Sequence, residues 1–216
     1  MGQLHKILAG NNSRCCWGAW TGGADCGGVG LMPVLVTLLR GVNVSGARPL
    51  KMATLAMIYE KLGFRDVRTY LQSGNAVCRV PMGSPARHAS AIERALLKEC
   101  GFDVPVAALT GEALGAVVAS NPLLRSRSAD PAFLHVTFLI GPAAQPVLDR
   151  DGLPLGPGED AVQAGNVVYV YCPNGYGITK INNACFERRL KVRATTRSWR
   201  TVLALRQMAL GAPLDP

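Results

Sequence analysis

The sequence has few of the residues that catalytic and metal sites usually require. Only three histidines occur among 216 residues, and they are His5, His88 and His135. None lies beside an obvious nucleophile, and no His, Cys or carboxylate spacing indicates a metal site. No pair of carboxylates is placed for general acid–base work. We therefore expect no metal and no cofactor, and the sequence leaves open whether the protein is an enzyme and which reaction it would catalyse.

The cysteine pattern excludes two further classes. The chain has 7 cysteines, an odd number, and no Cys-x-x-Cys motif. Neither a disulfide framework nor a zinc site is indicated, and we interpret the cysteines as reduced thiols of a cytosolic protein. No apolar run reaches the roughly 18 residues that a membrane-spanning helix needs. A cytoplasmic protein without membrane contact is therefore expected.

Charged residues are also scarce, at 17%, against 49% hydrophobic residues, which is enough to form a core in one large or two small domains. The net charge is +9, which favours anionic partners but also serves solubility. Most of the excess lies between Thr179 and Arg206, where Glu187 is the single acidic residue. The basic residues there are Lys180, Arg188, Arg189, Lys191, Arg193, Arg197, Arg200 and Arg206.

Residues 1–32 differ from the rest of the chain. They are rich in Gly, Ser and Asn and show no clear hydrophobic period. Only fragments of a signal peptide are present. This segment is either a flexible tail or an over-extended start, and we favour the second interpretation, with Met32 as the biological start.

From Pro33 the signals become regular and predict a first lobe over residues 33–120. An apolar strand is expected over 34–39, a helix over 52–62, a hairpin around Ser73-Gly74, a helix over 86–100 and a strand over 104–109. This order of strand, helix, strand, strand, helix and strand is that of a split βαβ, or ferredoxin-like, unit. A further helix over 110–120 has Thr110 as its predicted N-cap.

The second half repeats this order in degraded form over residues 131–210. The expected elements are a strand over 133–140, a short helix over 142–148, paired strands over 161–163 and 167–171, and helices over 181–190 and 198–208. A link is expected near 121–130. The predicted fold class is α+β, with two ferredoxin-like lobes, the second degenerate, plus C-terminal helices.

Several separated motifs resemble a known family. They are Leu38-Leu39-Arg40-Gly41-Val42-Asn43-Val44, Lys51-Met52, Gly63-Phe64, Val67 to Asn75, Gly175-Tyr176-Gly177, Lys180, Asn183, Glu187, Ala194 to Arg197, and Trp199. Together they resemble the bacterial domain-of-unknown-function 1697 family over Val34 to Leu205. The resemblance implies an α+β fold of ferredoxin-like units and no established activity. The chain departs from the family pattern at Ser45, Ala47, Arg48, Asn182 and Ser198.

The first group that could bind a ligand combines Arg40-Gly41-Val42-Asn43 with Gln72-Ser73-Gly74-Asn75. An arginine next to a glycine, whose missing side chain leaves the backbone accessible, can bind an oxyanion bidentately. Neighbouring side-chain amides can then orient the bound anion. The structural alternative is that Asn43 and Asn75 satisfy turn backbone while Arg40 pairs with a carboxylate.

Two further groups lie near the carboxy terminus. Asn174 to Lys180 is a Gly-rich turn that leads into a helix bearing Asn183, and such a turn can hold an anion, although it lacks P-loop spacing. Thr195-Thr196-Arg197-Ser198-Trp199 precedes the last helix, and Arg197 could face the same pocket. The alternatives are a solvated Lys180, a core Trp199, and hydroxyls that cap the helix.

The favoured hypothesis is that a small anionic ligand, a phosphate or carboxylate, binds in a cleft between the lobes. Its predicted contacts are Arg40, Asn43, Gln72, Ser73, Asn75, Lys180, Asn183 and Arg197. The alternative is a nucleic-acid-binding module that uses the basic C-terminal segment. The strands 34–39 and 75–80 have no aromatic residue for base stacking, which weighs against this alternative. Docking of the basic face on an acidic protein is a third possibility, and the oligomeric state is open.

Overall fold

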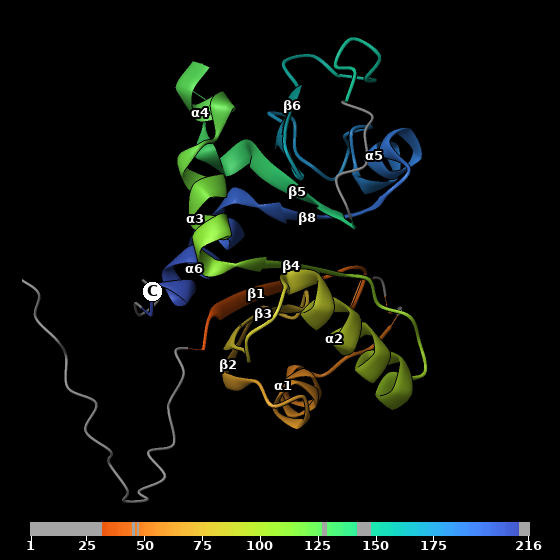
Figure 1. Ribbon diagram of the computed structural model, residues 1–216. Coiled ribbons are helices and arrows are strands. Elements are labelled where there is room, and N and C mark those ends of the chain that lie inside the picture. Colours follow the sequence, from red (N-terminus) through yellow and green to blue (C-terminus); the bar gives the residue numbers. More distant parts are fainter. Residues whose placement is uncertain (1–31, 45, 47, 127–128, 142–147, 212–216) are drawn as a thin grey trace, which may run out of the picture. The chain divides into compact units, whose positions relative to one another are not determined.

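Two apolar strands, β1 (Val34–Leu39) and β5 (Leu134–Ile140), lie inside two four-stranded antiparallel sheets. The computed structural model describes residues 32–44, 46, 48–126, 129–141 and 148–211 (Figure 1). The predicted extension, up to residue 31, and the predicted helix over 142–148, except Leu148, lie outside these residues. The α+β class is confirmed at the level of two antiparallel sheets with helices.

The first lobe comprises the first sheet and its two helices. The chain runs through β1, α1 (Met52–Lys61), β2 (Arg65–Tyr70), β3 (Asn75–Arg79), α2 (Pro85–Cys100) and β4 (Val106–Thr110). The sheet order is β2-β3-β1-β4. Each helix therefore connects two strands that have one other strand between them in the sheet.

The second lobe carries a sheet of corresponding order, β6-β7-β5-β8. Its strands after β5 are β6 (Asp160–Ala164), β7 (Val167–Tyr171) and β8 (Arg193–Ser198), with α5 (Asn183–Leu190) between β7 and β8. Three helices, α3 (Gly111–Ala119), α4 (Pro122–Ser126) and the 3-10 turn η1 (Pro131–Phe133), connect the lobes, and α6 (Trp199–Ala209) follows β8.

The two sheets have equivalent hydrogen bonds at corresponding positions, in addition to the corresponding strand order. The amide of Leu39 donates to the carbonyl of Gly74 at 2.8 Å, and the amide of Leu139 donates to that of Asn166 at 3.0 Å. Each bond joins the end of the inner strand to the turn before its antiparallel partner. In the second lobe no helix connects β5 to β6 within the described residues 148–159.

Alternation along the inner strands assigns each side chain to one of two faces. Leu35 and Leu39 pack with α1 and α2, whereas Val36 and Leu38 belong to a central cluster. That cluster also contains Phe138 of β5 and buried residues of α3, α4 and α6. Since both faces of β1 are covered, its run of apolar residues is the pattern expected for a fully buried strand.

Two local predictions required correction. Thr195 to Trp199 was expected to precede the last helix, with its hydroxyls as caps, but Arg193–Ser198 forms β8, which pairs with β5. Only Ser198 caps α6, by accepting from the amide of Thr201 at 3.3 Å. The helix predicted from residue 181 begins at Asn183. His88, in the first turn of α2, is buried, and its ring lies edge-on to that of Phe64 with 5.5 Å between the ring centroids.

Within the described part of the chain, no helix has the length and apolar character to cross a membrane. The same residues contain no group of three or more His, Cys, Asp or Glu arranged to hold a metal ion.

Candidate functional site

The loop after β1 is organised by the side chain of Asn43. Its Nδ2 donates to the carbonyls of Leu50 at 2.8 Å and Gln72 at 2.7 Å, and its Oδ1 accepts from the amide of Leu50 at 2.8 Å. Asn43 thus satisfies turn backbone, which is the structural alternative raised by the sequence. The side chain of Gln72 is exposed.

Arg197 joins β8 to the hairpin and strand end of the first lobe. Its Nε donates to Asn75 Oδ1 at 2.5 Å, and its Nη2 donates to the carbonyls of Leu39 at 2.6 Å and Ser73 at 3.1 Å. Its Nη1 donates to Thr195 Oγ1 at 2.7 Å and to the carbonyl of Thr196 at 2.9 Å. We call these residues, Leu39, Ser73, Asn75, Thr195, Thr196 and Arg197, the Arg197 clasp.

The five bonds of the Arg197 clasp use all five N–H groups of the guanidinium. Every acceptor is neutral. Burial of the charge lowers the pKa of Arg197 to about 10, so the side chain still carries its charge at neutral pH. Asn75 is fully buried, and its Nδ2 donates to Ser73 Oγ at 2.9 Å. In this arrangement the clasp holds the two lobes together and offers a ligand no free guanidinium donor.

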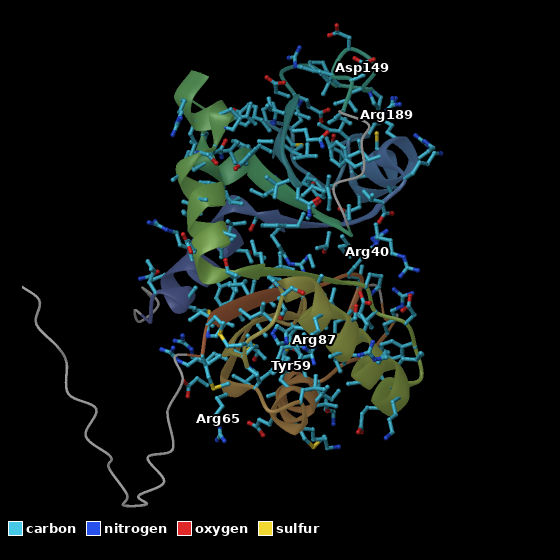
Figure 2. All side chains as sticks on the ribbon, in the orientation of Figure 1. Arg40, Tyr59, Arg65, Arg87, Asp149 and Arg189 are labelled. Atoms are coloured by element: carbon cyan, nitrogen blue, oxygen red, sulfur yellow. The ribbon has the colours of Figure 1, made fainter. Side chains whose placement is uncertain are left out.

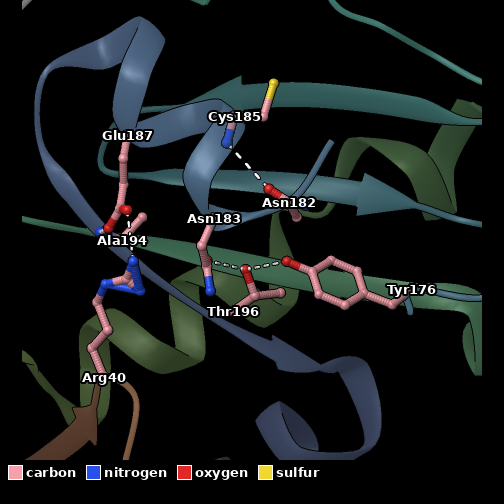
Figure 3. Close-up of polar contacts among 8 residues, drawn as sticks. All are labelled: Arg40, Tyr176, Asn182, Asn183, Cys185, Glu187, Ala194 and Thr196. Carbon is pink, nitrogen blue, oxygen red and sulfur yellow. Dashed lines mark hydrogen bonds and ion pairs between the residues drawn. The ribbon is translucent and has the colours of Figure 1, made fainter. Parts of the chain in front are cut away.

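Arg40 makes a second connection between the lobes. Its Nη2 lies 2.6 Å from Oε2 of Glu187 on α5, 147 residues away in the sequence (Figures 2 and 3). The two side chains are 27% and 21% exposed, so the pair is accessible to solvent. Oε1 of Glu187 accepts from the amide of Ala194 at 2.7 Å. This second bond fixes the carboxylate in front of Arg40.

A hydroxyl network lies next to this ion pair (Figure 3). The hydroxyl of Thr196 donates to Asn183 Oδ1 at 2.7 Å and accepts from the hydroxyl of Tyr176 at 2.9 Å. It also lies 2.7 Å from the hydroxyl of Thr137. We call Arg40, Tyr176, Asn183, Glu187 and Thr196 the polar seam.

Two electrostatic effects show how closely the polar seam is assembled. Burial raises the pKa of Tyr176, while the Thr196 hydroxyl, the backbone of Asn183 and the charge of Arg40 oppose this rise. Arg40 is therefore near enough to influence the phenol. The ring of His135 stacks on Tyr176 at 4.5 Å, and burial lowers the pKa of His135, which favours its neutral form.

The structure thus separates the predicted ligand residues into distinct groups. Arg40 and Asn183 lie in the polar seam, and Ser73, Asn75 and Arg197 lie in the Arg197 clasp. Asn43 satisfies turn backbone, while the side chains of Gln72 and Lys180 are exposed. Their roles as ligand contacts remain predictions.

Sequence reasoning did not place Tyr176, Glu187 or Thr196 in the predicted site. The spacing of Asn183 and Glu187 was an available signal, because residues four apart share one face of a helix.

A cavity of about 750 Å³ lies between the lobes, but its walls contain none of the eight predicted ligand residues. It is lined by parts of α2, β4, α3 and β5 and by the turn between β6 and β7. The polar seam and this cavity are therefore separate features of the lobe boundary.

Removing the Tyr176 hydroxyl should have a modest effect on stability. We expect Tyr176→Phe to lower the free energy of unfolding by about 1 kcal/mol, because one hydrogen bond to Thr196 is lost while the ring stack is kept. Tyr171→Phe is the matched control, since Tyr171 packs against Phe133 through its ring. Urea unfolding of both variants measures the difference, and equal stabilities would contradict the network.

Comparisons with known proteins agree with this architecture. The family described as "Protein of unknown function (DUF1697)" matches residues 32–169. No curated protein matches the chain. The solved structure of the conserved bacterial protein SP0830 from Streptococcus pneumoniae has a TM-score of 0.62 at 24% identity, and the match covers 82% of this chain and 99% of that one. At this identity the similarity concerns the fold alone.

Proposed function

This chain belongs to the DUF1697 family of proteins of unknown function, and from its geometry we propose that it is a cytosolic protein that binds a small anionic ligand at the polar seam. The observation that carries the proposal is the state of Arg40. Of its guanidinium nitrogens, only Nη2 donates a hydrogen bond to a described residue, Glu187. The remaining N–H groups of a partly exposed guanidinium are available to a phosphate or carboxylate.

Two neighbouring donors support the same ligand. Asn183 uses its Oδ1 to accept from Thr196, and its Nδ2 has no acceptor among the described residues. Lys180, three residues earlier in the chain, is exposed and forms no ion pair with a described residue. Asn183 begins α5, Lys180 precedes it by three residues, and Arg40 contacts Glu187 one turn further along the same helix. The helix dipole also favours negative charge at the start of α5.

Glu187 opposes this binding, because its carboxylate already offsets the charge of Arg40 at 2.6 Å. An anion at the seam must compete with it. We infer that Glu187 weakens the affinity and holds Arg40 in place when the ligand is absent.

The two lobes support a finer description of the fold. The order β2-β3-β1-β4, with helices after β1 and after β3, is that of a split βαβ unit. We propose that both lobes derive from this ferredoxin-like unit, the second with its first helix reduced.

The test is a calorimetric titration of the full chain with inorganic phosphate and with citrate. Arg40→Gln should weaken binding about 10-fold or more, because a charge-assisted hydrogen bond contributes roughly 1.5–3 kcal/mol. Glu187→Gln should strengthen it about 3- to 10-fold by removing the competing charge. The glutamine can still accept from the amide of Ala194 and keep the local fold.

Arg65→Gln is the matched control, since it removes one positive charge from an exposed position on β2, apart from Arg40 in the first lobe (Figure 2). Equal losses in Arg40→Gln and Arg65→Gln would reject the polar seam and leave only nonspecific attraction by the net charge. No saturable binding of either anion to the wild-type chain would also reject it.

The nucleic-acid alternative rests on the exposed basic residues Lys180, Arg188, Lys191, Arg200 and Arg206. Mixed-sequence RNA and DNA oligonucleotides belong in the same series. Binding of these oligonucleotides that weakens steeply as the salt concentration rises, and that is equally strong in the wild-type chain and in Arg40→Gln, would favour this alternative.

A further inference from the structure

The cavity between the lobes has walls of small and apolar side chains. They include Ala89, Ala107, Ala108, Val117, Phe138 and Val167. They come from α2, β4, α3, β5 and β7, and Figure 1 shows α2 and β4 on one side of the lobe boundary and β5 on the other. Its volume of about 750 Å³ lies within the roughly 300–1,000 Å³ of small-molecule sites. The alanines leave this space open, because larger side chains at the same positions would fill it.

The cavity is lined by an acidic side chain, whereas the protein as a whole carries a positive net charge. Although the chain has a net charge of +9, Glu93 of α2 is the one charged side chain among the described residues that line the cavity. The other polar side chains that the described residues contribute to its walls, those of Ser84, Ser90 and Asn166, are neutral. An anionic ligand would meet only a carboxylate here, so this cavity does not suit the ligand proposed for the polar seam.

The carboxylate of Glu93 is held in place at the open edge of β4. Its Oε1 accepts from the amide of Val106 at 2.9 Å, and its Oε2 accepts no hydrogen bond from a described residue. β4 pairs only with β1, so the outward N–H and C=O groups of β4 face away from the sheet. By alternation, those of Ala108 point the same way as the amide of Val106. One carboxylate oxygen and one peptide unit are therefore available beside an apolar surface.

We propose that this cavity binds an apolar amine, with its ammonium group on Glu93 and its hydrocarbon or aromatic part against the alanines and Phe138. The ammonium group satisfies Oε2 of Glu93, and the apolar body removes the cavity walls from water. This site is separate from the polar seam, and its ligand is a cation, whereas the ligand proposed for the polar seam is an anion.

The test uses tryptamine and indole-3-propionate, which share an indole and differ in the charge of the side chain. Calorimetry with the full chain should show tryptamine binding at least about 10-fold more tightly, the effect of one charge-assisted hydrogen bond. Glu93→Gln should remove that preference while its amide oxygen still accepts from Val106. Glu60→Gln, an exposed glutamate on α1 that does not line this cavity, should keep the preference.

A second variant tests the cavity without changing charge. Ala108→Leu should abolish binding of tryptamine by filling the space, and its thermal unfolding shows whether the fold is kept. Arg40→Gln should bind tryptamine like the wild-type chain, which separates this site from the polar seam. Equal binding of the two probes, an unchanged preference in Glu93→Gln, or no saturable binding of tryptamine would overturn the proposal.

Discussion

Replacing Arg197 with Met should lower the free energy of unfolding by about 3–5 kcal/mol, since each buried acceptor left without a donor costs roughly 1–3 kcal/mol. Methionine keeps much of the aliphatic volume but donates no hydrogen bond. The carbonyls of Leu39 and Ser73 and the side-chain oxygen of Asn75 would lose their bonds to the guanidinium. Since these acceptors belong to the first lobe and Arg197 to the second, three hydrogen bonds between the lobes are lost with them.

Arg193→Met is the control for this experiment. Arg193 lies on the same strand, and its Nη1 is 2.7 Å from Oδ2 of Asp103. That pair is exposed, with side chains 60% and 55% accessible, so its loss should cost less than about 1 kcal/mol. Urea unfolding followed by circular dichroism measures both variants. Similar midpoints for Arg197→Met and Arg193→Met would show that the clasp contributes no more than a surface pair.

After Arg197→Met, Gly74→Ala should destabilise the protein most. It should lower the free energy of unfolding by about 2–4 kcal/mol through backbone strain and overpacking together. Gly74 has a φ of +74°, and a Cβ built there would lie 2.6 Å from Cγ2 of Val42 and 2.7 Å from Cβ of Leu39. Both neighbours are buried and cannot move aside without disturbing the core.

Gly63→Ala separates the two causes. Gly63 has a φ of +80°, but a Cβ there meets no atom within 4 Å. It should therefore cost only the backbone strain, about 1–2 kcal/mol. The difference between the two variants in urea unfolding gives the steric part. If Gly74→Ala were no more destabilised than Gly63→Ala, the close approach of the hairpin to Val42 and Leu39 would be wrong.

The order of elements could be predicted because it depends on local pattern. The apolar run of β1, the helical spacing of α1 and α2, and the cap residues Thr110 and Ser198 each act over a few positions. Such local patterns can be recognised in one sequence alone.

β8 could not be predicted in the same way. Arg193 to Ser198 is polar except for Ala194, and such a run favours a turn or a helix start. It is a strand because six consecutive residues of β5 pair with it and because Arg197 finds three of its five acceptors in the other lobe. Tertiary contacts thus override the local preference.

The candidate site was only partly predictable for a related reason. Arg40 and Asn183 were identified as ligand candidates, but the pairing of Arg40 with Glu187 joins residues 147 positions apart. The cavity is harder still, because its alanines have no chemical signature and only their arrangement around Glu93 creates a site.

The most direct test of the central claim is a nuclear magnetic resonance titration of the wild-type chain and of Arg40→Gln with inorganic phosphate. The account predicts that phosphate shifts the wild-type amide resonances of Lys180 and Asn183 and the Nε resonance of Arg40. In Arg40→Gln the amide shifts should be absent. Shifts confined to other residues, or equal amide shifts in both proteins, would contradict the claim that Arg40 and the start of α5 form one anion-binding site.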